Sequence, residues 1–560
     1  MALDLSGLPA AALDLIGPGG PYEVVERDLN GASLRLFRQA PPNLGALYRS
    51  ALDTGDRTFY VYRDERYTFA DAWDRAGRVV AGLRALGVAP GDRVGISLRN
   101  YPEWIWSFMG ITRMGAVAVA MNSWWTAEEM AYGIDDSGLS VLIVDHERLK
   151  LLPPEPRSFT AVAVRTEGSE GTGALAWSDF TASEDDAGFA DPVDPEAPAT
   201  LLYTSGSTAH PKGVLSTHRA VIHALLGWEA AGALAAAVAD QPPPELPWQL
   251  SMILTVPLFH VTGLNVHFLS SFRHGRKLVG MYKWDPEEAL KIIERERITH
   301  FNGVPTMAWE LVQSPNYERY DLSSLVSMGG GGAAMAPEHS RQISQRSVSP
   351  GTGYGMTETN GLGTAVGGPE LLERPTSCGR PLPPVVDIKV VDHAGREVPR
   401  DETGEIWIRG PMNFSGYWNR AEDAANTLVE GWVRTGDIGH MDAEDFVYIT
   451  DREKDMVIRG GENIGCQEVE AVIYEHPAVL ECAVFGVPDE RLGEAVAAAV
   501  TRKPGASLAA EAVRTHVAAH LARFKVPEHV WVRDEQLPRI ASGKIFKRGL
   551  RAEAMEALSR

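Results

Sequence analysis

Cysteine is scarce in this chain of 560 residues, which contains only Cys378, Cys466 and Cys482. The three residues stand far apart and show no spacing typical of a metal site. We therefore expect buried structural thiols. Free thiols of this kind fit the reducing environment of the cytoplasm.

Basic residues are outnumbered, since 53 lysines and arginines stand against 74 acidic residues, giving a formal net charge of -21. A nucleic-acid partner needs a basic footprint, so the balance argues against one. Any anionic substrate must instead be held by local lysines and backbone N–H groups.

Long apolar runs with the features of a membrane or targeting segment are missing as well. The first twenty residues contain Asp4 and Asp14 and no basic start, which excludes a signal peptide. The alanine-rich run from Ala230 to Ala239 is about half the length of a membrane span. We expect a soluble protein without a transmembrane segment, and contact with a membrane surface stays open.

Strand and helix patterns alternate in the first two hundred residues, and a second such series begins at Met252, which predicts parallel sheets covered by helices. A strand over 93–98 precedes a helix whose start is signalled by Asn100 and Glu103, and Thr126 with Glu129 predicts a capping box. Asp285 and Pro286 predict another helix that ends near Arg297. After Gly379 short strands with turns predict an antiparallel sheet or barrel, and residues 455–560 suit a small independent domain.

A hydroxyl-rich loop follows the apolar run at Leu201 and leads to Lys212 and Gly213. Its glycines let N–H groups turn toward a polyphosphate, and its hydroxyls add donors. The loop is not a Walker A motif, because the lysine follows proline. It predicts a site for the β- and γ-phosphates of ATP, and the alternative is a surface Ser/Gly loop. The candidate residues are Thr204, Ser205, Gly206, Ser207, Thr208 and Lys212.

Further motifs carry groups that suit nucleotidyl transfer. Tyr354, Thr357 and Glu358 offer a flat ring, an α-phosphate donor and an oxygen ligand for Mg²⁺ within five positions. Asp437 can accept ribose hydroxyls beside Arg452. The run from Met328 to Ala334 lacks bulk, so a ring or acyl chain could lie on its backbone, unless it is simply a flexible glycine loop.

Two more candidates depend on their context. His260 follows a predicted strand, where ligands bind in open α/β sheets, although a lone histidine is more often structural. Lys544 follows a flexible Ser-Gly pair, so it could extend toward charge that develops on phosphate and carboxylate oxygens; alone, it would be read as a solvated lysine.

Together these motifs resemble the acyl-adenylate-forming superfamily, and most closely its fatty-acid and medium-chain acyl-CoA synthetases. The resemblance covers about residues 40–550 and departs at Ala209, usually glycine, and at Ile540, usually threonine. It implies an α/β fold: a large N-terminal domain (1–450) of two doubly wound sheets plus a distorted β-barrel, a hinge (451–456) with Lys454, and a small mobile α+β domain (457–560).

The resemblance also assigns roles. It makes Lys544, Thr357, Glu358 and His260 catalytic, with Glu358 on Mg²⁺, and Gly460 and Gly461 binders of CoA. The implied ATP and AMP residues beyond the phosphate loop are Gly332, Ala333, Ala334, Tyr354, Gly355, Met356, Asp437, Ile449 and Arg452. The implied acyl pocket consists of His260, Val304, Met307, Gly329, Gly331 and Met356.

The sequence therefore predicts an ATP-dependent acid–CoA ligase that acts on a fatty or aryl-alkyl acid, because no lysine or arginine among the pocket candidates could bind a second carboxylate. One alternative is an enzyme that loads a carrier protein, although neither a carrier domain nor an attachment serine follows Arg560. The other is a non-catalytic nucleotide-binding homologue, although Lys544 and Glu358 are present. The expected partners are the acid, ATP and CoA, and a homodimer is possible.

Overall fold

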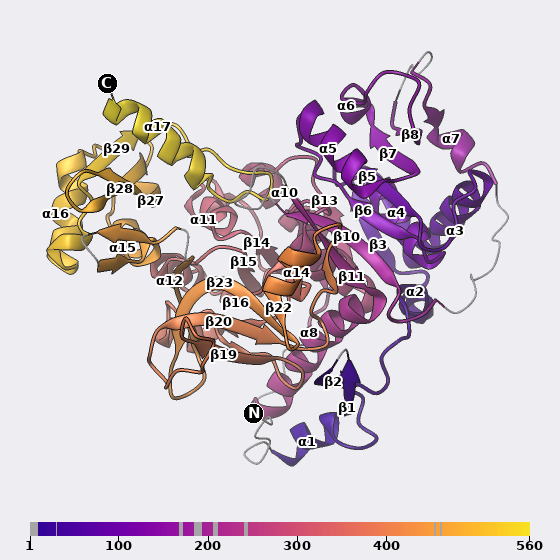
Figure 1. The fold of residues 1–560 in the computed structure, drawn as a ribbon, viewed down its shortest axis with the longest axis horizontal. Coiled ribbons are helices and arrows are strands. Elements are labelled where there is room, and N and C mark those ends of the chain that lie inside the picture. The colour runs from indigo at the N-terminus through magenta and orange to yellow at the C-terminus, as the bar shows by residue number, and fades with distance from the viewer. Residues whose placement is uncertain are drawn as a thin grey trace.

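The structure is a computed structural model that describes residues 9–29, 31–166, 172–183, 193–204, 211–239, 245–452, 455–459 and 462–559. Figure 1 shows the small C-terminal region lying against one side of a much larger N-terminal region. Two large mixed sheets form the centre of the larger region. The predicted fold class, α/β with a large and a small part, is confirmed.

The first large sheet has eight strands and is mostly parallel, as the alternating pattern predicts. Its order is β21 (Gly416–Tyr417), β11 (Lys212–Thr217), β10 (Pro198–Thr204), β6 (Val117–Ala120), β5 (Arg93–Ser97), β7 (Val141–Asp145), β8 (Thr160–Val164) and β9 (Leu175–Ala176). Strands β10 and β11 form an antiparallel hairpin around the loop that was predicted to bind phosphates. Strand β5 (Arg93–Ser97) confirms the strand predicted over 93–98.

The second large sheet has nine strands, with a parallel centre and antiparallel edges. Its order is β18 (Arg380–Pro381), β17 (Thr364–Gly367), β16 (Ser349–Tyr354), β15 (Ser327–Gly331), β14 (His300–Gly303), β12 (Ser251–Leu254), β13 (Lys277–Gly280), β3 (Thr58–Tyr62) and β4 (Glu65–Thr68). An early hairpin, β3 and β4, thus completes a sheet whose other strands come two hundred residues later.

Helices cover these sheets, and most of their ends follow local sequence rules. Thr126 and Glu129 form the predicted capping box of α5, and Asp285 caps α10, which ends before a left-handed Arg297. The helices of this region are α2 (Leu44–Ser50), α3 (Phe69–Ala85), α4 (Pro102–Arg113), α5 (Ala127–Ser137), α6 (His146–Leu149), α7 (Trp177–Phe180), α9 (Ser270–Arg273), α10 (Pro286–Glu296), α11 (Pro305–Gln313), α12 (Pro337–Gln345) and α13 (Gly368–Glu373).

The predicted start signal of α4 was wrong. Asn100 does not cap this helix, whose N-cap is Tyr101 and whose first residue is Pro102. The Asn100 side chain instead accepts a hydrogen bond from the Leu258 N–H at 3.0 Å and donates to the Val256 carbonyl at 3.3 Å. Asn100 therefore ties the first large sheet to the turn that carries His260.

Helix α8 (His218–Val238) is longer than the alanine-rich run suggests. Among the described residues it is the one helix that is long and apolar enough to cross a membrane by length and composition. Its first half, including Val221, Ile222, Ala224 and Leu225, is buried in the largest apolar core. Helix α1 (Ala10–Ile16) packs on its second half through Ala12, Ile16 and Leu234. A core helix of a globular domain has these same properties.

The third sheet is antiparallel, as the short strands after Gly379 predict. It consists of β19 (Asp387–Val391), β20 (Gly404–Arg409), β23 (Trp432–Met441), β22 (Leu428–Val429) and β24 (Val447–Arg452), with α14 (Ala421–Thr427) nearby. A separate two-stranded ribbon, β1 (Val24–Leu29) and β2 (Ala32–Phe37), lies near the N-terminus.

The small C-terminal region has its own sheet and its own core. The sheet consists of β26 (Glu462–Ile464), β25 (Val457–Arg459), β28 (Gly493–Arg502), β27 (Val479–Asp489) and β29 (His529–Arg533), and the helices are α15 (Cys466–Tyr474), α16 (Ala510–His520) and α17 (Lys547–Ser559). Cys466 and Cys482 lie in this core, and Cys378 is half-buried. All three thiols are free, and burial raises their pKa values.

Candidate functional site

Four adjacent parallel strands of the nine-stranded sheet bring four of the predicted motifs to one edge. In the order β16, β15, β14 and β12, these strands are followed by Thr357 and Glu358, by Gly332 to Ala334, by Val304, and by the turn with His260. Because the carboxyl ends of parallel strands meet at one edge, motifs spread over about a hundred residues converge there. Gly332, Ala333 and Ala334 are exposed at this edge.

The eight-stranded sheet contributes the ends of the predicted phosphate loop. Thr204 ends β10 and Lys212 begins β11, whereas Ser205, Gly206, Ser207 and Thr208 lie outside the described residues. The Lys212 ammonium is 2.9 Å from an Asp423 carboxylate oxygen and 5.2 Å from the centre of the Tyr417 ring. An ammonium carries three donors, so this ion pair leaves capacity for a phosphate oxygen.

Glu358 is buried and shares a neighbour with Lys212, namely Tyr417, a residue that the sequence motifs do not single out. The Tyr417 hydroxyl donates to Oε1 of Glu358 at 2.7 Å, and the Glu358 carbonyl accepts from the Phe414 N–H. Burial raises the pKa of the Glu358 carboxyl, and the hydrogen bond from Tyr417 opposes the shift. Tyr417 lies on β21 opposite Val214 of β11, a pairing that sequence patterns do not predict.

The predicted ribose pair is brought together by the third sheet. Asp437 on β23 and Arg452 on β24 are register partners, and Arg452 Nε lies 3.2 Å from Oδ1 of Asp437. The Tyr354 hydroxyl donates to the other oxygen, Oδ2. Burial raises the pKa of Asp437 even though Arg452 lowers it. Tyr354, expected only as a flat surface for adenine, therefore also orients this carboxylate.

Lys544 reaches the same edge from the small C-terminal region. Its side chain lies over Gly332, where an added methyl group would be 2.9 Å from Cε and 3.1 Å from Nζ of Lys544. Gly332 has a φ of +82°, a conformation that favours glycine. Burial, with a smaller contribution from the charge of Arg452, lowers the pKa of Lys544 to about 8, and Asp437 opposes the shift. Lys544 is thus placed between the predicted adenine wall and the ribose pair.

His260 lies in the turn between β12 and an eight-residue π-helix (Thr262–Leu269). Burial, with a smaller contribution from the Lys544 charge, lowers its pKa to about 3. The imidazole is therefore neutral at pH 7 and offers one donor and one acceptor. Asn100, which binds the backbone of this turn, supports its position.

The predicted acyl-pocket residues do not all meet in one apolar cluster. Val304 and Met307 belong to the same cluster and lie against Gly543. Met356 packs instead with Val214, Phe414 and Val433, in a separate cluster.

The structure also supplies a second reason for the glycines of β15, which the sequence predicts to leave space for a ligand. A Cβ at Gly329 would lie 2.2 Å from the Gly351 carbonyl oxygen, and one at Gly331 would lie 3.0 Å from the Gly353 oxygen. Close packing against β16 therefore requires small residues at these positions.

The remaining predicted residues are placed as follows. Gly355 has to be glycine, because a Cβ there would lie 2.4 Å from the Gly361 carbonyl oxygen. Ile449 lies half-buried on β24. Lys454, Gly460 and Gly461 lie outside the described residues, so the hinge and CoA assignments stay predictions, as do the boundaries at 450 and 456.

Comparison with known proteins identifies the family. The sequence profile of the AMP-binding enzyme family matches residues 47–418, and that of the AMP-binding enzyme C-terminal domain matches residues 468–544. The chain belongs to the AMP-binding enzyme family.

Individual relatives agree with this assignment. The chain is 33% identical over 543 residues to a long-chain-fatty-acid–CoA ligase of Bacillus subtilis (strain 168), covering 90% of this chain and 93% of the relative. It is 34% identical over 486 residues to a feruloyl-CoA synthase of an Amycolatopsis species, covering 86% and 92%. The crystal structure of the anthranilate CoA ligase AuaEII in complex with anthranoyl-AMP superposes with a TM-score of 0.83 at 27% identity, covering 92% of this chain and 98% of the other.

Proposed function

We propose that this family member is an ATP-dependent acid–CoA ligase that converts a hydrophobic carboxylic acid, fatty or aryl-alkyl, to its acyl-CoA through an acyl-adenylate. The position of Lys544 carries the proposal, because it lies beside Gly332 with Asp437 and Arg452 as charged neighbours. The relatives named above are acyl-CoA and aryl-CoA ligases. The chain is accordingly an enzyme of the acyl-CoA ligase type.

In the first half-reaction, a carboxylate oxygen of the acid attacks the α-phosphorus of ATP. The new bond joins acyl oxygen to phosphorus, and the bond to the pyrophosphate oxygen breaks. The carboxylate is already ionised at neutral pH, so the neutral His260 need not remove a proton. Lys544 and Thr357 stabilise charge that develops on the α-phosphate oxygens.

In the second half-reaction, the thiol of CoA attacks the acyl carbon of the adenylate. A carbon–sulfur bond forms, the bond from carbon to the AMP oxygen breaks, and the thiol proton is lost to solvent. Lys544 is not required at the phosphate in this step. A movement of the small region away from the large one would give the thiol access to the acyl carbon.

The acid is expected to be hydrophobic because the neighbours of the site are apolar. Val304 and Met307 face the Lys544 loop from the large region, and both belong to an apolar cluster with Phe301 and Met328. A second carboxylate on the substrate would find no cationic partner among these residues. This argument favours fatty and aryl-alkyl acids over diacids.

Magnesium is proposed to bind at Glu358 together with phosphate oxygens. Among the described residues, no group of three or more His, Cys, Asp or Glu side chains could hold a metal. Mg²⁺ commonly binds one or two carboxylates plus substrate phosphates, and the buried Glu358, which shares Tyr417 as a neighbour with Lys212, fits that donor set. When bound, the metal would neutralise phosphate charge.

The metal proposal predicts that Glu358→Gln raises the magnesium concentration needed for half-maximal adenylation severalfold. Because burial raises the pKa of Glu358, its ionised form destabilises the folded protein at pH 7, above the unfolded pKa. The uncharged amide should therefore leave the melting temperature of the ligand-free protein unchanged or slightly higher. A magnesium titration of pyrophosphate release and a thermal melt measure both effects. An unchanged magnesium requirement would remove Glu358 from the metal site.

The reaction itself is tested by measuring pyrophosphate and AMP with and without CoA over a panel of acids. We expect pyrophosphate release with hydrophobic acids, and AMP formation that depends on CoA. Transfer to a carrier protein but not to CoA would favour the carrier-loading alternative. Absence of pyrophosphate release with every acid would contradict the proposed function.

We also propose a cytoplasmic location. Three free thiols whose pKa values are raised by burial suit a reducing compartment. Fractionation of cells that produce the protein should recover it in the cytosolic fraction, and recovery in a periplasmic or extracellular fraction would contradict the proposal.

A further inference from the structure

We propose that Arg539 is a positioning residue that docks the Lys544 loop on helix α11 for adenylation, with Glu310 and Thr306 as its partners on the large region. The proposal rests on the proposed function, because it assigns the residue a part in the first half-reaction only. Arg539 lies five residues before Lys544 in the same loop.

The Arg539 guanidinium joins three parts of the molecule. Nη1 donates to Thr306 Oγ1 at 2.6 Å and to the Gly543 carbonyl at 2.8 Å. Nη2 donates to Oε1 of Glu310 at 2.9 Å and to Oε1 of Glu481. Thr306 and Glu310 belong to α11, Glu481 belongs to β27 of the small region, and Gly543 immediately precedes Lys544.

The two carboxylates differ in what else holds them. Oε2 of Glu481 accepts from the Leu537 N–H at 3.0 Å, so this residue stays with the loop of Arg539. Oε2 of Glu310 accepts from the indole N–H of Trp284 at 2.5 Å, so it stays with the large region. If the small region moves away, Arg539 keeps Glu481 and Gly543 but loses Glu310 and Thr306.

The cost of that loss favours the docked arrangement. Burial raises the pKa of Glu310, and the charge of Arg539 opposes the shift. A buried carboxylate without its cation is unfavourable, and hydrogen bonds between charged groups are stronger than neutral ones. Within the large region, Glu310 accepts a hydrogen bond from the neutral indole of Trp284. Docking adds the positive charge of Arg539 as its partner.

Helix α11 presents one face to the small region, since Thr306, Trp309 and Glu310 follow the i, i+3, i+4 spacing of a helix face. The Trp309 indole N–H donates to the Leu480 carbonyl at 2.9 Å, one residue before Glu481. At the start of the helix, Val304 and Met307 lie against Gly543. The contacts on this face thus run from β27 to the residue before Lys544.

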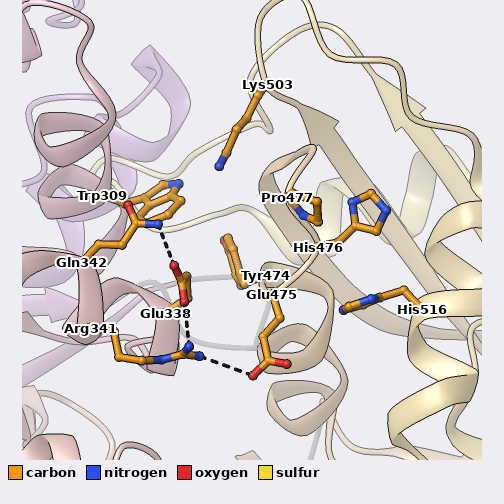
Figure 2. Close-up of a pocket in the computed structure, with 10 residues that line it drawn as sticks. All are labelled: Trp309, Glu338, Arg341, Gln342, Tyr474, Glu475, His476, Pro477, Lys503 and His516. Atoms are coloured by element: carbon orange, nitrogen blue, oxygen red, sulfur yellow. Dashed lines mark hydrogen bonds and ion pairs between the residues drawn. The ribbon is translucent and has the colours of Figure 1, made fainter. Parts of the chain in front are cut away.

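Figure 2 shows the groove that borders this docking face, between α12 of the large region and α15 of the small region. The groove has a volume of about 460 Å³, and Trp309 and Lys503 lie at one end of it. A single ion pair, between Arg341 and Glu475 at 3.6 Å, crosses it among the residues drawn. The α12 side of the interface is therefore held by this ion pair and by the ring contact of His339 with Tyr474, whereas α11 carries the contacts with the Arg539 loop.

The test compares the two half-reactions in the full-length enzyme. Glu310→Gln should slow pyrophosphate release from ATP and acid about tenfold, because it removes a charge-assisted hydrogen bond. Thioester formation from supplied acyl-adenylate and CoA should stay within about twofold. Trp309→Phe should give a smaller loss in the same direction, and Glu318→Gln, which removes a carboxylate paired with Arg346 inside the large region, should change neither rate.

A double-mutant cycle separates positioning from a general structural effect. If Glu310 acts through Arg539, the double variant Glu310→Gln with Arg539→Gln should adenylate no more slowly than Arg539→Gln alone. Additive losses, or equal losses in both half-reactions, would overturn the proposal. If Glu310→Gln does not fold, Thr306→Val tests the same contact with a neutral partner.

The outcomes distinguish this role from the proposed function. A wild-type protein that forms no adenylate with any acid contradicts the function itself and this role with it. An active wild-type protein with an unaffected Glu310→Gln variant contradicts only the role of Arg539.

Discussion

The large-region side of the site and the Lys544 side are held in different ways. Asp437 is fixed by Tyr354 and by Arg452, the last residue of β24, and Glu358 is fixed by Tyr417, so these contacts do not involve the small region. Lys544 reaches the site on a loop of the small region that rests on α11 and Gly332. The difference suggests that substitutions on the first side affect every step that holds the nucleotide, whereas those on the second affect adenylation alone.

The largest expected effect comes from Lys544→Ala, which removes the charge supplied by the small region. Adenylation should fall by at least about a hundredfold, the scale of one preorganised electrostatic donor. Thioester formation from supplied acyl-adenylate should survive much better. Rapid-quench assays of both half-reactions measure the difference. Equal losses would contradict the idea that Lys544 acts in adenylation alone.

Asp437→Asn tests the opposite side. It keeps the shape of the side chain but removes the charge that pairs with Arg452 and that we propose binds the ribose, so nucleotide binding should weaken about thirtyfold. The loss should appear in both half-reactions, because ATP and acyl-adenylate share the ribose. Isothermal titration with AMP and both kinetic assays check this. A loss confined to adenylation would contradict the ribose assignment.

Gly332→Ala sharpens the comparison, because the residue belongs to the large region but contacts Lys544. A methyl group would displace the Lys544 side chain and strain a backbone with φ of +82°. We expect adenylation to fall about tenfold while AMP affinity and thioester formation change little. A thermal melt serves as the folding control. Equal losses in both half-reactions would show that the contact of Gly332 with the nucleotide matters more than its contact with Lys544.

The smallest effect concerns pH. Adenylation needs the charged ammonium of Lys544, whose pKa is lowered to about 8, so kcat/KM for ATP should be constant below pH 7 and fall as pH rises through about 8. At pH 8 the loss is about twofold. In Lys544→Arg the side chain stays charged, so the fall in kcat/KM should move above pH 10, even if the rate itself is lower. If kcat/KM of that variant still falls near pH 8, the pH dependence belongs to another group.

Local signals in the sequence predict a large part of the fold. The capping residues Thr126 and Asp285 mark helix starts that the structure confirms, because a cap and its helix lie within a few residues. Asn100 shows the limit of such rules, since its side chain binds the backbone of Leu258, 158 residues away, instead of the following helix. The early strand β3 likewise could not be assigned to its sheet, because its parallel partner β13 comes some two hundred residues later.

The sequence by itself determined the candidate residues for the chemistry, because each motif places its donors, carboxylates and glycines in a few consecutive positions. Only the tertiary structure decided how those motifs support one another. Tyr417 meets Glu358 across 59 residues, and Arg539 meets Thr306 across 233. Such contacts depend on strand order and on where the small region docks, and both are set by packing between distant segments. Short-range sequence patterns do not encode these relations.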